Sequence, residues 1–344
     1  MTPIGAFARH ADGTLSALPG APFRTGGAGT GTILGSQGAL QLTADGHFLL
    51  AVDAGSNQIS VLRVGMDGAL SQVGDGTVSS GGITPVSVAV HGDLVYVANA
   101  GNGKAGSNYT GFRLSAAGQL SPIAGSTVPL SAAASPGQVL FNATGTLLLG
   151  TEVGPAKGPS FVDSFSVGQD GKLTPAPGSP YRAQAVGPLG SEFSPTNPSR
   201  VYVSNAHAGP NRGSVSAYNA ASNGALTPIG ASPYADKQTA PCWVEISHDG
   251  RYLFAVNTAV PSISSYRIAA DGSLALLGST VFNQPTGLRP FDARLDPKGG
   301  YLYVVAPGLD VVSVFAVHGG TLTELPASPV ALPAKATPFG IVVN

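Results

Sequence analysis

The chain has 344 residues, a formal net charge of −1, and only 10% charged residues beside 43% hydrophobic ones. It shows no basic stripe or polybasic cluster, so charge gives no reason to expect nucleic acid or an anionic membrane as a partner. The single cysteine, Cys242, excludes an internal disulfide and a multi-cysteine zinc site. With 48 Gly and 28 Pro, the composition favours an all-β class rich in turns.

The first residues, MTPIGAFARH, carry neither the basic segment nor the apolar run of a signal peptide, and no stretch reads as a membrane span. We therefore expect a soluble protein, either cytoplasmic or exported with its signal peptide removed. We also expect a monomer whose partner is a small-molecule substrate. Trimming of the N-terminus is a further expectation, for a reason given below.

A turn followed by Gly-x-Leu recurs along the chain every 48 to 55 residues. The seven copies begin at Gly13, Gly68, Gly118, Gly171, Gly224, Gly272 and Gly320. A period near fifty residues, made of four short strands, is typical of propeller blades. The sequence therefore predicts one domain, residues 1–344, folded as a seven-bladed β-propeller of four-stranded antiparallel blades.

The predicted first and second strands recur with the same period. First strands are expected to start near Gly38, Val86, Gln138, Ser191, Trp243, Phe291 and Phe339, mostly just after a Pro or Gly. Second strands are predicted at residues 48–53, 94–99, 147–152, 201–205, 252–257 and 302–305. The copy at residues 240–279 is the best formed, with four β-rich runs separated by Asp-Gly turns.

The seventh blade lacks a second strand. We expect residues 339–343 to form its inner strand and residues 4–9 and 14–18 its outer strands, so that the two ends of the chain close the ring. A missing strand would leave backbone groups unpaired inside a sheet. Either this blade has three strands, with 4–9 moved inward, or the natural chain continues upstream; we favour the second.

The repeated blades resemble the bacterial β-propeller lactonases related to 6-phosphogluconolactonase. The resemblance is carried by PVSVAVHGDLVYVANAG (residues 85–101), APCWVEISHDGRYLFAVN (240–257) and VSVFAVHGGTLTELPASP (312–329). It spans nearly the whole chain and is more specific for the fold than for an activity. It implies a lactonase-like hydrolase that opens or forms a small lactone or cyclic ester without a cofactor.

Candidate catalytic residues were sought in the loops after second strands and before first strands, which share one face of a propeller. Glu152 ends a second strand and could act as a general base, or simply bond to loop amides. His207 follows the next second strand and could relay a proton, or merely be exposed. Arg289 precedes the inner strand of the sixth blade and could bind a carboxylate or oxyanion, or pair with Asp292 or Asp296.

Substrate-binding residues are expected at the same ends of the strands. They are Gln37, Asp53, Glu192, Asn205, Trp243 and Asn257. The indole of Trp243 is predicted to pack in the core or in the wall of the channel rather than to stack on a sugar. Cys242 is predicted to be a buried and unreactive thiol. The glycine-rich run 26–35 lacks the Lys-Ser/Thr end of a phosphate loop and is predicted to be flexible.

Three alternatives stay open at this point. The same residues could catalyse isomerisation or cyclisation of a metabolite instead of hydrolysis. The propeller could bind a ligand or protein without catalysis. We expect no metal site, although Glu152, Asn205 and Asn257 could instead surround Ca²⁺.

Overall fold

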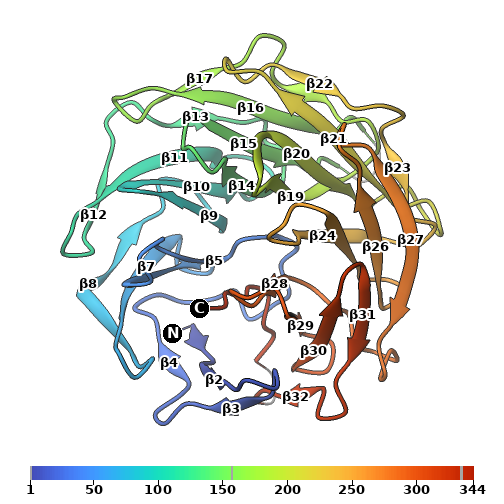
Figure 1. Cartoon of the computed structure of the whole chain (residues 1–344). Helices are drawn as coiled ribbons and strands as arrows, with labels where there is room; N and C mark the ends of the chain where they lie inside the picture. Colours follow the sequence, from blue (N-terminus) through green and yellow to red (C-terminus); the bar gives the residue numbers. More distant parts are fainter. Residues whose placement is uncertain (1, 156–157, 334–335) are drawn as a thin grey trace.

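The computed structural model describes residues 2–155, 158–333 and 336–344, which form a ring of β-sheets around a central axis (Figure 1). Six of the sheets contain four consecutive strands in the order first, second, third, fourth, and all neighbours are antiparallel. No helix occurs in the described part of the chain. The predicted all-β propeller is confirmed.

The strands of these six blades run from the axis outward. They are β5 (Leu40–Leu42), β6 (Phe48–Asp53), β7 (Gln58–Val64) and β8 (Leu70–Ser79) in blade 1; β9 (Pro85–His91), β10 (Leu94–Ala100), β11 (Ser107–Leu114) and β12 (Leu120–Pro122) in blade 2; β14 (Pro136–Phe141), β15 (Leu147–Glu152), β16 (Phe161–Val167) and β17 (Leu173–Pro175) in blade 3; β19 (Pro188–Ser194), β20 (Asn197–Asn205), β21 (Ser214–Ala220) and β22 (Leu226–Pro228) in blade 4; β24 (Pro241–Ile246), β25 (Tyr252–Asn257), β26 (Ser262–Ile268) and β27 (Leu274–Val281) in blade 5; β28 (Ala293–Leu295), β29 (Tyr301–Ala306), β30 (Val311–His318) and β31 (Thr321–Glu324) in blade 6.

Four blades have a split outer strand, whose second piece pairs further along the third strand. These pieces are β13 (Val128–Pro129), β18 (Tyr181–Arg182), β23 (Tyr234–Ala235) and β32 (Val330–Ala331). The predicted second strands coincide with the observed ones to within a residue or two, except in blade 4, where the strand starts earlier. Their apolar runs are buried on both faces because each blade is packed between two others.

The recurring Gly-x-Leu turn joins neighbouring blades. Tyrosines at the centre of three second strands donate a hydrogen bond to the carbonyl of the turn glycine in the next blade: Tyr96 to Gly171 at 2.8 Å, Tyr202 to Gly272 at 3.0 Å and Tyr303 to Gly13 at 3.0 Å. Gly13 has φ +83°, and a Cβ there would lie 2.4 Å from the ring of Tyr301. This turn therefore requires glycine for its conformation and for the close approach.

The seventh position of the ring is incomplete. β1 (Pro3–Ile4) pairs with β4 (Phe23–Arg24), and β2 (Phe7–Arg9) pairs with β3 (Leu15–Ala17), which together supply a third and a split fourth strand. The outer strands are thus as predicted. Residues 339–343 run along the axis but are not a strand, so that prediction is wrong; the second strand that would pair with them is absent from the described residues.

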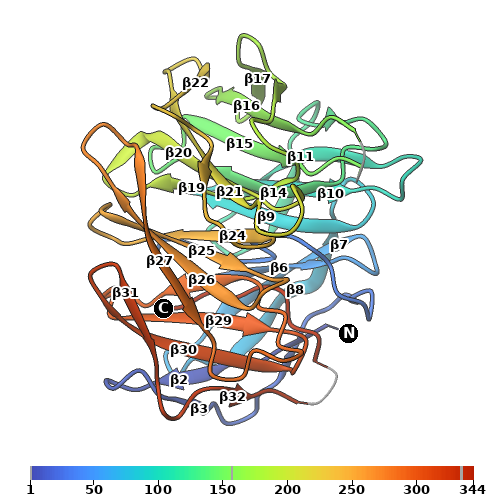
Figure 2. The ribbon, with the colours of Figure 1, turned by 90° about the vertical axis from the view of Figure 1, so that its right-hand side faces the viewer.

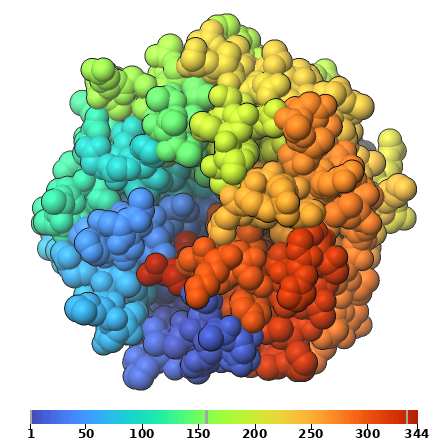
Figure 3. Space-filling model, viewed as in Figure 1, coloured from blue at the N-terminus to red at the C-terminus, as the bar shows by residue number. Residues whose placement is uncertain are grey.

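The ring has two different faces. The turns between first and second strands, such as 43–46 and 247–250, lie on one face, which we call the turn face. The loops that lead into first strands lie on the other, the loop face. The two chain ends lie on opposite faces at the seventh position (Figure 2). Figure 3 looks onto the turn face, where the C-terminal residues are visible near the centre.

Candidate functional site

The loop face of the axis, where the site was expected, is closed. The loop before β5 crosses to the far side of the ring, where the indole nitrogen of Trp243 donates to the Ser36 carbonyl at 2.7 Å. The side chain of Gln37 donates to the Val244 carbonyl at 2.9 Å and accepts from the Val244 amide at 3.2 Å. Trp243 stacks on Phe291 with ring centroids 4.4 Å apart. Residues 26–35, which were predicted to be flexible, therefore lead into a plug formed by Ser36, Gln37 and Trp243.

Gln37 and Trp243 are fully buried in this plug. Both were expected to bind substrate, and the structure gives both a packing role at the closed end of the axis. Cys242, beside them, is buried as predicted, and burial raises the pKa of its thiol to about 11. A thiol with that pKa is a poor nucleophile near neutral pH.

Asp53, Asn205 and Asn257 end their second strands inside their own blades. The carboxylate of Asp53 accepts hydrogen bonds from Thr25 at 2.7 Å and Ser60 at 2.6 Å. The amides of Asn205 and Asn257 donate at 2.9 Å to Ser216 and Ser264 respectively, which hold the same place in the third strand. These polar pairs lock the second strand to the third, and they do not converge on a common ligand position.

Glu152 occupies the same place in blade 3, but its third-strand partner is an acid, Asp163. The two carboxyl groups share a hydrogen bond, and Asp163 also accepts one from the Tyr109 hydroxyl at 2.8 Å. Burial, and then the charge of Glu152, raise the pKa of Asp163 to about 8; burial also raises the pKa of Glu152. This buried pair keeps a proton at neutral pH.

His207 and Arg289 stand apart from Glu152. Both are exposed on loops, and no described contact joins them to Glu152 or to each other. Partial burial lowers the pKa of His207. Arg289 has φ +50°, as the residue before the inner-strand proline, and Asp292 and Asp296 pair with other arginines. The structure therefore does not assemble the three expected catalytic residues.

A different charged group lies on the axis, on three neighbouring inner strands. Glu192 of β19, Glu245 of β24 and Arg294 of β28 hold the same register, each opposite the centre of its second strand. Figure 1 shows these three strands side by side around the axis. Of these residues only Glu192 was predicted, as a substrate-binding residue.

Arg294 is anchored by one nitrogen. Its Nη1 lies 3.0 Å from Glu245 Oε2, 3.7 Å from Asp292 Oδ1, and 3.0 Å from the Ala293 carbonyl. The other oxygen of Glu245 accepts from the Leu295 amide at 3.0 Å, and Asp292 accepts from the Gly38 amide of the plug at 3.2 Å. Among the described residues, the hydrogen bonds and ion pairs of the Arg294 side chain all run through Nη1, which leaves Nε and Nη2 available to a ligand.

Glu192 is the group in this cluster best placed for proton transfer. Its side chain is partly exposed, and no hydrogen bond to its carboxyl is found among the described residues. Burial, and then the negative charge of Glu245, raise its pKa to about 8, although Arg294 opposes the shift. Burial raises the pKa of Asp292 to about 6. The cluster thus combines a carboxyl that titrates near neutral pH with a fixed cation.

Sequence reasoning missed Glu245, Arg294 and Asp163, although the repeat contains a signal for each. Glu192, Glu245 and Arg294 lie four residues after the inner-strand prolines Pro188, Pro241 and Pro290. Asp163 replaces the serine or threonine that other third strands carry in that register. Aligning the copies residue by residue would have brought these positions together.

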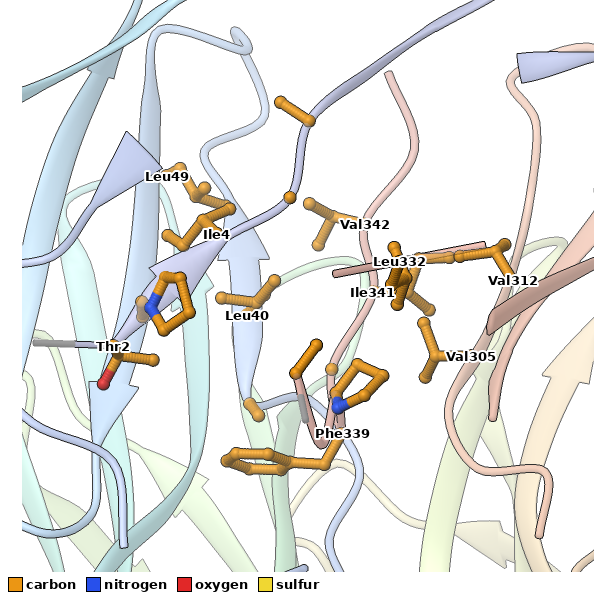
Figure 4. Close-up of a pocket in the computed structure, with 18 of the residues that line it drawn as sticks. Thr2, Ile4, Leu40, Leu49, Val305, Val312, Leu332, Phe339, Ile341 and Val342 are labelled. Atoms are coloured by element: carbon orange, nitrogen blue, oxygen red, sulfur yellow. The ribbon is translucent and has the colours of Figure 1, made fainter. Parts of the chain in front are cut away.

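A pocket lies elsewhere, at the incomplete seventh position. It has a volume of about 600 Å³, and Ile4, Leu40, Leu49, Val305 and Val312 are among its lining residues (Figure 4). No Asp, Glu, His or Cys side chain among the described residues lines it. It therefore offers mostly apolar contact and, among the described residues, no carboxyl, imidazole or thiol group for proton transfer.

Metal binding is not suggested by any cluster. The described residues contain no group of three or more His, Cys, Asp and Glu side chains that could hold an ion. Likewise, the described residues include no helix able to cross a membrane.

Comparison with known proteins settles the family. Residues 148–338 match the family described as lactonase, seven-bladed β-propeller. The chain belongs to this lactonase family. The six complete sheets and the incomplete seventh position agree with that description, and membership makes the protein a lactonase-like hydrolase, as the resemblance implied. A comparison with curated proteins finds no match.

Solved structures similar to this lactonase share its fold. A candidate 6-phosphogluconolactonase of Bacteroides uniformis is 23% identical with a TM-score of 0.71, covering 95% of this chain and 92% of its own. A second one, from Bacteroides fragilis, is 21% identical with a TM-score of 0.71, covering 95% and 91%. The periplasmic gluconolactonase PpgL of Pseudomonas aeruginosa is 19% identical with a TM-score of 0.65, covering 94% and 92%. At these identities the likeness concerns the fold alone.

Proposed function

We propose that this lactonase hydrolyses a small uncharged lactone at the turn-face end of the axis, with Glu192 as general base and acid and Arg294 as the oxyanion-binding group. The observation that carries the proposal is that Glu192, which is partly exposed, holds the same register on β19 as Glu245 on β24 and the anchored Arg294 on β28. The raised pKa of Glu192, about 8, supports it. Figure 3 shows the face from which substrate would approach.

The reaction follows from these two groups. Ionised Glu192 takes a proton from a water molecule as the water oxygen attacks the lactone carbonyl carbon. The negative charge that develops on the carbonyl oxygen is stabilised by Nε and Nη2 of Arg294. The ring C–O bond then breaks, and protonated Glu192 gives its proton to the leaving oxygen. The product is an open-chain hydroxy acid.

The charge of the cluster favours an uncharged substrate. Arg294 is the one cation in a group that also holds Glu192, Glu245 and Asp292. A phosphate dianion would meet these carboxyl groups without a second cation to balance them. Two of the similar proteins are described as 6-phosphogluconolactonases. Because of the charge of its cluster, this chain is instead expected to prefer the unphosphorylated lactone.

The test is hydrolysis of gluconolactone, followed by proton release and corrected for the spontaneous reaction. Because Glu192 must be ionised to act as base, kcat/KM should rise with pH through about 8. The Glu192→Gln variant should lose at least about 100-fold in kcat, which is the usual scale for a general base. EDTA should leave the rate unchanged.

Two matched variants decide where the chemistry lies. Glu152→Gln and His207→Ala remove the residues first predicted from the sequence, and both should keep most of the activity. Full activity in Glu192→Gln, or its loss in Glu152→Gln with an unchanged melting temperature, would overturn the proposal. A preference for 6-phosphogluconolactone would contradict the expected substrate charge.

A further inference from the structure

Three charged side chains hold the same register on consecutive inner strands, and Glu245 is the middle one. Glu192 of β19 lies on one side of it and Arg294 of β28 on the other, as the order of these strands around the axis shows (Figure 1). Glu245 therefore stands between the carboxyl that was proposed above as the base and the cation that was proposed above as the oxyanion-binding group.

Glu245 is held in place by both of its oxygens. Oε2 lies 3.0 Å from Arg294 Nη1, and Oε1 accepts a hydrogen bond from the Leu295 amide at 3.0 Å. The side chain of Glu245 is 9% exposed. Two bonds to consecutive residues of β28 leave this carboxylate little freedom to turn, so it acts as a fixed negative charge.

Arg294 lies near three carboxyl groups and pairs with two of them. Nη1 lies 3.0 Å from Glu245 and 3.7 Å from Asp292. Burial lowers the pKa of this guanidinium, but the charges of Asp292, Glu245 and Glu192 together raise it above its ordinary value. All three carboxyl groups thus act on the cation, yet no ion pair joins it to Glu192 among the described residues.

Without its anchor on Glu245, the guanidinium would turn to Glu192. Asp292 is already held by the amides of Gly38 at 3.2 Å and Ala293 at 2.9 Å, whereas the carboxyl of Glu192 has no hydrogen bond among the described residues. Arginine and a free carboxylate form paired, charge-assisted hydrogen bonds. Such a pair would occupy Nε and Nη2 and hold Glu192 ionised, so the base and the oxyanion-binding group would neutralise each other.

We propose that Glu245 is a positioning residue that keeps Arg294 and Glu192 apart, an inference that rests on the function proposed above. Its Oε2 binds Nη1 and so leaves Nε and Nη2 free for the carbonyl oxygen of a lactone. Its fixed charge also disfavours a second negative charge beside it, so that Glu192 stays unpaired and basic. Asp292, and His248 on the turn after β24, are further titratable groups beside this trio.

The first test is the Glu245→Gln variant, which removes the charge and keeps the size of the side chain. The pKa of Glu192, about 8 in the parent, should fall by about one unit or more, because a like charge leaves and a cation approaches. The midpoint of the kcat/KM profile should move down with it. On the plateau, kcat should fall about 100-fold or more, since the oxyanion-binding nitrogens are occupied.

Titration of Glu192 needs no substrate, so it separates two kinds of failure. The chain contains four glutamates, and carbon-13 NMR of labelled glutamate carboxyls should resolve four titrations, with Glu192→Gln identifying the relevant signal. A downward shift in Glu245→Gln, without lactone hydrolysis by the parent, would contradict the proposed function and leave the role of Glu245 intact. An unmoved midpoint of Glu192 in folded Glu245→Gln would overturn that role, whatever the activity.

Two controls exclude a purely structural role for Glu245. Glu245→Asp keeps the charge and should keep the midpoint of Glu192 near 8, even though its shorter side chain reaches Arg294 less well. Glu152→Gln removes a buried carboxyl outside the cluster and should leave this midpoint unchanged. If Glu245→Gln does not fold, Glu245→Ser removes the same charge, leaves room for water and carries the same expectation. An equal shift in Glu152→Gln would mean that the titration reports the fold, and the proposal would be wrong.

Discussion

Replacing Arg294 by methionine should destabilise the protein far more than replacing a surface arginine of similar geometry. Arg294 is 16% exposed, and its loss leaves Asp292, fully buried, and Glu245, 9% exposed, without a counter-charge. Removing one partner of a buried ion pair costs about 3–5 kcal/mol. For 344 residues this corresponds to a fall in melting temperature of about 4–7 °C.

The matched control is Arg251→Met. Arg251 Nε lies 2.8 Å from Asp249 Oδ2, a closer pair than that of Arg294, but the two side chains are 67% and 50% exposed. An exposed pair contributes at most about 1 kcal/mol, so this variant should melt within about 1–2 °C of the parent. The comparison therefore separates the effect of burial on the stability of an ion pair from the effect of the distance between its charges.

The dependence on pH provides a second check. Lowering the pH through about 6 protonates Asp292, so the penalty for losing Arg294 should shrink. Thermal melting of both variants and the parent at pH 5 and pH 8, followed by the fluorescence of Trp243, measures all of these differences. If Arg294→Met melted no lower than Arg251→Met at pH 8, or if its deficit were larger at pH 5, the reasoning would be refuted.

Three further predictions concern buried polar groups. The native pKa of Asp163 is raised to about 8, so the stability that this residue contributes is present at low pH and is lost as the pH rises. The Asp163→Asn variant should therefore show a smaller fall in melting temperature between pH 6 and pH 9 than the parent. An unchanged fall would exclude Asp163 as its source. Gln37→Ala leaves the amide and carbonyl of Val244 unpaired, and each unpaired group costs about 1–3 kcal/mol of stability. This variant should therefore melt several degrees lower than the parent. An unchanged melting temperature would mean that the Gln37 side chain does not hold the plug. Cys242 should resist a thiol reagent in the folded protein and react fully in urea, and rapid labelling of the native chain would contradict its burial.

The sequence predicted the positions of most strands well because the same strand pattern recurs in every blade, so that each copy helps to locate the strands of the others. Residues 252–257 were placed as a second strand from an apolar run between two turns, and β25 has those bounds. The seventh inner strand at 339–343 failed for a reason outside its own sequence, because a strand needs a partner and the partner is absent from the described residues.

The site was harder to predict because side-chain partners across blades cannot be read from one copy. Asn205 and Asn257 looked like mouth residues, yet the side-chain amide of each donates a hydrogen bond to a serine on the neighbouring strand of its own blade. Gln37 looked like a ligand contact, but a loop carries it across the axis to Val244, 207 residues further along the chain. Only the fold reveals such long-range pairs.

The plug formed by Ser36, Gln37 and Trp243 has a consequence for turnover. In the hydrolysis proposed above, the closed loop-face end would leave substrate and product only the turn-face end of the axis, so the hydroxy acid would have to leave before another lactone could enter. Product should therefore inhibit competitively. A carboxylate formed there, beside Glu245 and Asp292, would also be repelled by them, so the acidic surroundings of Arg294 would speed the departure of the anion that the proposed reaction creates.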